Sequence, residues 1–118
     1  MSSASRRLYV QQLLGLYRLV PGTTGHPRRS DRLLALQLHQ RGVPLGVIHA
    51  AFILAVARRT FRSPSASALA PIATLHYFQP VIHELLDHPY EPDYLDYLRH
   101  KLAPVAPALV AACDHQLA

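Results

Sequence analysis

The sequence predicts an all-α protein, a single five-helix, bundle-like domain with a central apolar helix over residues 44–62. Leu and Ala supply 36 of the 118 residues, whereas the β-branched Val and Ile supply only 12. Straight and small side chains lose less rotamer freedom in a helix than β-branched ones do, so this composition favours helices. No stretch shows sustained alternation of apolar and polar residues, and no strand is therefore expected.

The first two predicted helices have recognisable signals at their ends. An apolar stripe spans residues 5–20, and a Pro-Gly pair follows it. The second helix is expected to begin at Ser30, because a serine hydroxyl at the N-cap accepts a backbone N–H, and Asp31 complements the helix N-terminus. Gly42 is expected to end this helix, since glycine is the usual residue just beyond a helix C-terminus.

The central helix is predicted over residues 44–62. Pro44 suits its first turn, where the missing N–H costs nothing. Its residues are apolar on almost every side, which is typical of a helix buried at the centre of a bundle. A DNA-reading helix-turn-helix over residues 30–59 is a less favoured alternative, because the recognition helix would present only His49 on a mostly apolar surface.

Prolines separate the remaining elements. The fourth helix is predicted at about residues 72–86, kinked or restarted at Pro80, and a fifth opens at Pro92. Two further prolines interrupt the rest of the chain. A helical domain is therefore expected over residues 1–103, followed by a short C-terminal tail, 104–118, that is at best a frayed and dispensable helix.

Charge is unevenly distributed along the chain. Residues 1–62 hold ten Arg and one Asp, a formal charge of +9, whereas residues 63–118 carry −4. This polarity indicates a basic face for nucleic acid and an acidic face for a protein partner. Two alternatives stay open: the two ends fold against each other and partly neutralise, or the Arg content reflects a coding bias that also enriches Ala and Pro.

Eight arginines are the candidate nucleic-acid-binding residues. They lie at the start of the first helix, around the start of the second, and at the end of the central helix. The turn at Gly42 is expected to bring the last two groups into one patch, where the planar donor forks would hold a phosphate backbone. The alternative is a solvated surface. The eight residues are Arg6, Arg7, Arg28, Arg29, Arg32, Arg58, Arg59 and Arg62.

An acidic, tyrosine-rich stretch is the candidate protein-binding surface. Tyrosines with a polar tip are typical of protein interfaces, whereas acidic neighbours disfavour stacking on nucleic-acid bases. Packing of these tyrosines on the bundle is an equal alternative. The candidate partner-binding residues are Tyr90, Asp93, Tyr94, Asp96 and Tyr97.

The residue pattern does not indicate catalysis, a metal or a cofactor, so a non-enzymatic protein is expected. The single cysteine, Cys113, excludes an internal disulfide and a multi-cysteine metal site. His83 and His88 are separated by about 140° around a helix, so they do not share a metal as two histidines four residues apart would. Cys113 has His115 nearby, but no third group to orient a nucleophile.

A cytoplasmic location without a membrane partner is expected. The longest apolar stretch, residues 50–57, is far shorter than the roughly 20 residues that span a bilayer. Gln and Arg interrupt the apolar run near the start, and no small-residue cleavage site follows, so a secretory signal is not predicted. A free cysteine fits a reducing compartment.

Residues 30–86 resemble the helical module of the DnaD family of primosomal proteins. The order is similar: a short helix, a glycine turn, a long apolar helix, a loop, and a helix with a Tyr-x-x-x-apolar pattern. The corresponding residues are Tyr77, Val81 and Leu85, with Leu85 in place of the family's tryptophan. The resemblance implies DNA binding, self-association into a homo-oligomer, and a role with a replication initiator or helicase loader. Residues 42–78 also look like small proteins of bacterial mobile elements.

The function predicted from the sequence is therefore a non-enzymatic DNA-binding accessory protein of bacterial replication or of a mobile genetic element. The arginine patch would bind the phosphate backbone, and the acidic tyrosine-rich helix would bind a protein. The alternative is a protein-interaction or scaffold domain without nucleic-acid binding. Salt distinguishes the two, because counterion release gives DNA affinity a steep dependence on salt concentration.

Overall fold

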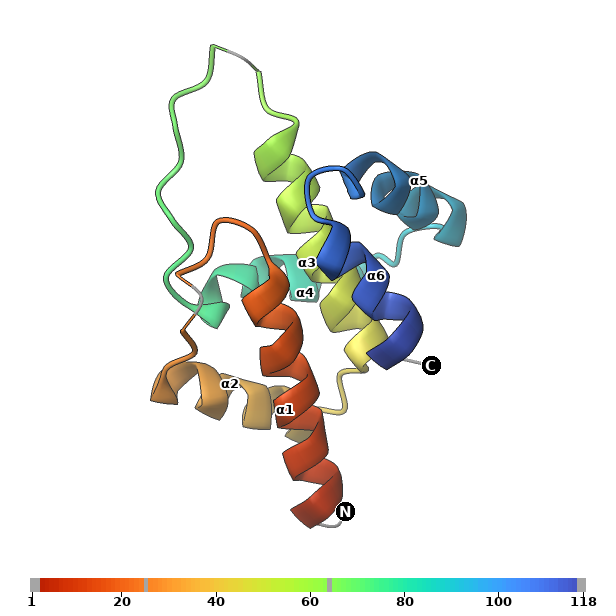
Figure 1. Ribbon diagram of the computed structural model, residues 1–118. Helices are drawn as coiled ribbons and strands as arrows, with labels where there is room; N and C mark the ends of the chain where they lie inside the picture. The colour runs from red at the N-terminus through yellow and green to blue at the C-terminus, as the bar shows by residue number, and fades with distance from the viewer. Residues whose placement is uncertain (1–2, 25, 64, 117–118) are drawn as a thin grey trace.

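The fold is all-α, as the composition predicts. The structure is a computed structural model that describes residues 3–24, 26–63 and 65–116, with side chains as far as residue 112. This part of the chain contains six α-helices rather than the predicted five, and one 3-10 helix (Figure 1). The elements are α1 (Ser3–Leu19), α2 (Arg29–Gln40), α3 (Leu45–Thr60), the 3-10 helix η1 (Leu75–Phe78), α4 (Gln79–Asp87), α5 (Pro92–Leu102) and α6 (Pro107–Gln116).

Helices α1 and α2 cross at a steep angle and pack against each other (Figure 1). Near the start of α1, the Tyr9 ring packs edge-on against His39 in the last turn of α2, with 5.0 Å between the ring centroids. The Tyr9 hydroxyl also donates to the backbone carbonyl of Val43, at 2.7 Å. The chain reverses after α1 at Gly22, whose φ of +88° lies in the left-handed region that glycine adopts without strain. One face of each helix is thereby buried against the other.

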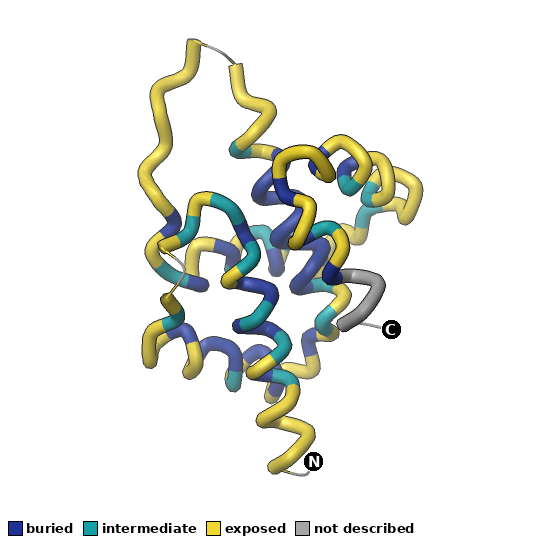
Figure 2. Tube along the Cα trace, in the orientation of Figure 1, coloured by how far each residue is buried: buried dark blue, intermediate teal, exposed yellow. Residues whose placement is uncertain are grey.

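Helix α3 is the centre of the fold, as predicted. Ten consecutive residues, 48–57, are buried, and the tube of Figure 2 is dark blue along this helix. The Phe52 ring lies 4.6 Å from Phe78 and 6.5 Å from Tyr17, so α1, α3 and η1 meet in one aromatic cluster. A helix buried on all sides cannot lie in a DNA groove, which rules out the helix-turn-helix alternative.

The start of α2 differs from the prediction. Arg28, not Ser30, is the N-cap, and Ser30 is an exposed residue of the first turn. The fully buried Asp31 carboxylate accepts the backbone N–H of Arg28 through Oδ2, at 2.8 Å. Its Oδ1 accepts the backbone N–H of Leu75, also at 2.8 Å. A carboxylate accepts these bonds more strongly than a hydroxyl, and it joins the starts of α2 and η1.

The predicted fourth helix is broken into three parts. Residues 72–74 are extended, and Ile72 makes an isolated parallel bridge with Thr23. The Thr74 hydroxyl then accepts the backbone N–H of His76 and starts η1. The α-helical part begins only at Gln79, with Pro80 in the first turn. Pro80 thus restarts the helix, since a proline in that turn breaks no helical hydrogen bond.

The C-terminal segment is not the frayed tail that its prolines suggest. Helix α6 contacts α1, α3 and α5, and Leu109 is fully buried. The buried His49 of α3 donates from Nε2 to the Leu109 carbonyl, at 2.7 Å. The prolines are compatible with this helix because Pro107 is its first residue and Pro104 lies in the preceding turn. Residues up to at least Ala112 therefore share the core of the domain.

Leu109→Ala should lower the free energy of unfolding by about 2–4 kcal/mol, because it removes a fully buried side chain and leaves a cavity. Urea unfolding followed by circular dichroism measures the change. The control is Val105→Ala, at a residue 49% exposed in the loop before α6, which should unfold near the wild-type midpoint. Equal midpoints for the two variants would mean that α6 is dispensable after all.

Candidate nucleic-acid interface

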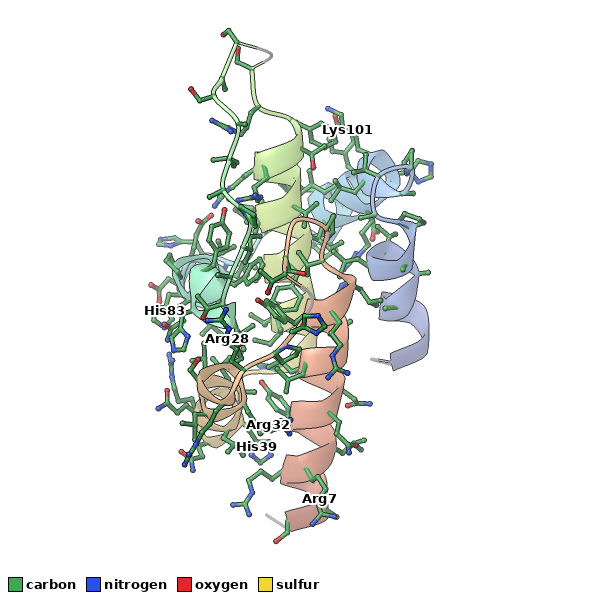
Figure 3. All side chains as sticks on the ribbon, turned by 60° about the vertical axis from the view of Figure 1, so that its left-hand side comes forward. Arg7, Arg28, Arg32, His39, His83 and Lys101 are labelled. Carbon is green, nitrogen blue, oxygen red and sulfur yellow. The ribbon has the colours of Figure 1, made fainter. Side chains whose placement is uncertain are left out.

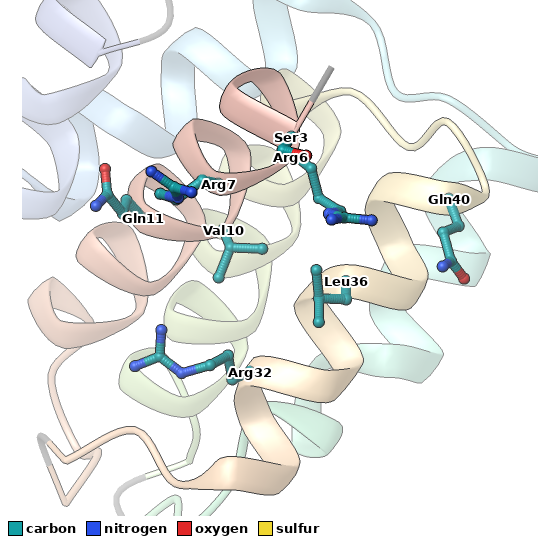
Figure 4. A pocket seen from close by; sticks show the side chains of 8 residues that line it. All are labelled: Ser3, Arg6, Arg7, Val10, Gln11, Arg32, Leu36 and Gln40. Atoms are coloured by element: carbon teal, nitrogen blue, oxygen red, sulfur yellow. The ribbon is translucent and has the colours of Figure 1, made fainter. Parts of the chain in front are cut away.

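A groove of about 650 Å³ lies between α1 and α2. It combines three arginines with two glutamine amides and an apolar floor (Figure 4). Five of its eight lining residues come from α1 and three from α2. The lining residues are Ser3, Arg6, Arg7, Val10, Gln11, Arg32, Leu36 and Gln40.

Helical spacing explains why these residues meet. Arg32, Leu36 and Gln40 follow one another at intervals of four along α2, so they form a row on one face. Arg6 and Val10 have the same spacing on α1. In Figure 4, Arg6 reaches from α1 toward α2, Arg32 reaches back toward α1, and Val10 and Leu36 lie between the helices. The packing of α1 on α2 thus turns two separate rows into one groove.

The arginines of the groove are exposed and keep their charge uncompensated. No hydrogen bond or ion pair joins the side chain of Arg6, Arg7 or Arg32 to another group within the described part of the chain. The neighbouring acid, Asp31, is buried and turned to the backbone of η1. Guanidinium groups present fixed forks of N–H donors that match phosphate oxygens. The groove can therefore bind an anion without breaking an existing contact.

The arginines at the end of α3 are engaged within the fold instead. Arg58 donates both terminal nitrogens to the Glu84 carboxylate, at 3.0 and 2.6 Å. Arg59 donates to the Ala70 carbonyl at 2.9 Å and to the Tyr77 hydroxyl at 3.2 Å. Arg62 donates to a backbone carbonyl of the 61–74 loop, at 2.8 Å. These three arginines fasten α4 and that loop to α3.

The predicted merging of the two arginine groups is wrong. Figure 1 shows α3 running away from α2, so that its C-terminal end lies at the far end of the molecule. Figure 3 places Arg7, Arg28 and Arg32 beside α1 and α2, well below that end. The reason is that Gly42 and Pro44 send α3 away while α2 packs on α1. Arg28 and Arg29 are exposed at the start of α2, outside the groove lining.

Tyr90 belongs to the cluster that Arg58 forms with Glu84. Its hydroxyl donates to Glu84 Oε2 at 2.7 Å and accepts from Arg58 at 3.1 Å. These hydrogen bonds, first from Arg58 and then from Tyr90, lower the pKa of Glu84 to about 2. Tyr90 is half-buried, and its polar tip is already bonded. Tyr90, one of the predicted partner-binding residues, therefore contributes to the packing of α3 and α4 within the fold.

The other predicted partner-binding residues lie on the exposed face of α5. Tyr94 and Tyr97 are 46% and 54% exposed, and their rings stack with centroids 6.3 Å apart. Together with Phe61 and Lys101 they border a hollow of about 340 Å³. The Lys101 ammonium sits 4.5 Å from the Phe61 ring centroid. Asp93 is exposed, and the equally exposed Asp96 pairs with Arg99 at 2.8 Å.

Sequence reasoning missed the polar and apolar companions of the groove arginines. Ser3, Gln11 and Gln40 are ordinary surface residues when viewed one at a time. The sequence shows that Arg32, Leu36 and Gln40 are four residues apart and share one face of a helix. It does not show that this face packs against α1. The three residues of the DnaD-like pattern do not share one α-helix, since Tyr77 lies in η1 and the other two, Val81 and Leu85, lie in α4.

Other kinds of site are not seen in the described residues. No group of three or more His, Cys, Asp or Glu side chains among them could hold a metal ion. His83 accepts a hydrogen bond from Arg41 at 3.2 Å, while the side chains of Cys113 and His115 lie outside the described part. No helix described is long and apolar enough for a membrane crossing. Comparison of the chain with protein-family models, with curated proteins and with solved structures finds no match.

Proposed function

We propose that this protein is a non-enzymatic, cytoplasmic DNA-binding accessory protein that binds phosphate in the groove between α1 and α2. Arg6, Arg7 and Arg32 are the phosphate-binding residues. The observation that carries the proposal is their convergence, from two helices, on one groove in which they have no intramolecular acceptor. The role in bacterial replication or in a mobile genetic element is the part of this proposal that rests on the sequence resemblance.

The proposal narrows the arginine set expected from the sequence. Arg28 and Arg29 are exposed at the N-cap and the first residue of α2, and they extend the positive charge beyond the groove. The arginines at the end of α3 are not proposed to bind phosphate, because their guanidinium groups already donate to a carboxylate, a hydroxyl and backbone carbonyls. Binding through phosphate would be insensitive to sequence and steeply dependent on salt.

A second candidate function is a protein-interaction domain that uses α5. The exposed Tyr94 and Tyr97, beside Phe61 and Lys101, favour it, because aromatic side chains are enriched at the centres of protein interfaces. The two functions use different helices and different residues. They are separable by mutation.

The double variant Arg6→Gln, Arg32→Gln should bind DNA more weakly and with a shallower salt dependence. Each lost phosphate contact reduces the slope of log affinity against log salt by about one, so a reduction of about two is expected. Fluorescence anisotropy with single-stranded and duplex DNA at about 50 and 200 mM salt measures both quantities. Gln keeps the polarity of these exposed positions, so the fold should be retained.

The matched control is Arg18→Gln, Arg41→Gln, which removes the same charge from exposed residues outside the groove, one in α1 and one just after α2. It should bind more tightly than the groove variant. A second control, Tyr94→Ala, Tyr97→Ala, should leave DNA affinity unchanged. The proposal fails if wild-type protein binds neither DNA form at low salt, or if the two arginine variants behave alike.

A further inference from the structure

We infer that the groove between α1 and α2 takes an unpaired nucleotide, so that the protein prefers single-stranded nucleic acid to duplex. In this arrangement Arg6, Arg7 and Arg32 hold the phosphates, and the base lies on the floor formed by Val10 and Leu36. The inference rests on the proposed function, because it assigns a ligand to the same site.

The shape of the groove separates a single strand from a duplex. The arginines surround a recess, whereas proteins that read a duplex insert a projecting helix or ribbon into its groove. Bases of a duplex are stacked inside it and cannot reach a recessed floor without being flipped out. A volume of about 650 Å³ falls within the range of sites that enclose a small molecule. One nucleotide is a ligand of that kind.

The chemistry of the lining fits a base as well as a phosphate. Val10 and Leu36 offer an apolar surface between the helices, against which a planar base can lie. The amides of Gln11 and Gln40 carry both donors and acceptors, so they can bond to the edge of an unpaired base. A guanidinium plane can also stack on a base. A site for inorganic phosphate alone would need neither the apolar floor nor the amides.

The variant Gln11→Ala, Gln40→Ala tests the base-binding part without changing any charge. Its affinity for a single strand of about 16 nucleotides should fall about tenfold, with the salt slope unchanged, because hydrogen bonds to the base are lost while the phosphate contacts stay. Its affinity for the same sequence as a duplex should not change. Gln37→Ala, on the exposed side of α2 outside the groove, is the matched control.

Wild-type protein should bind the single strand at least about tenfold more tightly than the duplex in the same buffer. Adenosine monophosphate at millimolar concentration is a competitor for the same groove. We expect it to displace the strand, because one nucleotide carries both the phosphate and the base that the groove binds; no displacement would count against a base in the groove. Equal affinity for strand and duplex, or unchanged strand affinity of the glutamine variant, would overturn it while leaving the proposed function intact. Absence of binding to every probe at low salt would overturn both.

Discussion

Phe52→Asp is expected to abolish the cooperative unfolding transition. Phe52 is fully buried in α3, where it packs against the rings of Tyr17 and Phe78. Loss of a buried ring costs about 3–5 kcal/mol, and an unpaired carboxylate at the same place costs several more. This total is comparable with the whole stability of a domain, about 5–15 kcal/mol. Near-ultraviolet circular dichroism and a thermal melt would show the loss of fixed tertiary structure.

Leu33→Asp is the matched control for this change. Leu33 is 50% exposed on α2, so the same charge would stay in water there and the melt should remain close to that of the wild type. Ile48→Asp, at another fully buried position of α3, should behave like the Phe52 variant. A soluble Phe52→Asp protein with a sharp melt would show that α3 is a surface helix and would reopen the helix-turn-helix interpretation.

Asp31→Ala is expected to cost about 3–5 kcal/mol of unfolding free energy. The carboxylate accepts two backbone N–H groups, those of Arg28 and Leu75, and hydrogen bonds to a charged group contribute about 1.5–3 kcal/mol each. Without it, the start of α2 loses its cap and η1 loses its connection to α2. Urea unfolding measures the change in midpoint and slope.

Two further variants test the assignment of the cap. Asp31→Asn keeps one carbonyl oxygen and can replace one of the two bonds, so its loss of stability should be intermediate. Ser30→Ala should be nearly neutral, because the Ser30 side chain is exposed and makes no cap. A Ser30→Ala variant less stable than Asp31→Ala would restore the serine cap that the sequence suggests. The arginine groove depends on this cap, since α2 carries Arg32.

The sequence alone determined the class of the fold and its centre. Helix-forming composition predicts an all-α protein, and the apolar run after Pro44 predicts the buried helix α3, because both depend only on residues close together in the chain. The excess of positive charge in residues 1–62 was equally visible. The bundle also includes α6, although the sequence around it contains two prolines, because α6 packs on α1 and α3 and buries Leu109.

Only the tertiary structure decided which arginines stay available. Arg58 resembles Arg6 in sequence, yet its partner Glu84 lies 26 residues away, on a helix whose position no local pattern encodes. Arg6 and Arg32 are just as far apart in sequence, and they line one groove because α1 and α2 pack against each other. Local patterns determine which residues share one helix face. Which helix that face packs against depends on how all the helices pack together. This packing gives the arginines at the end of α3 intramolecular partners and leaves those of the groove between α1 and α2 exposed.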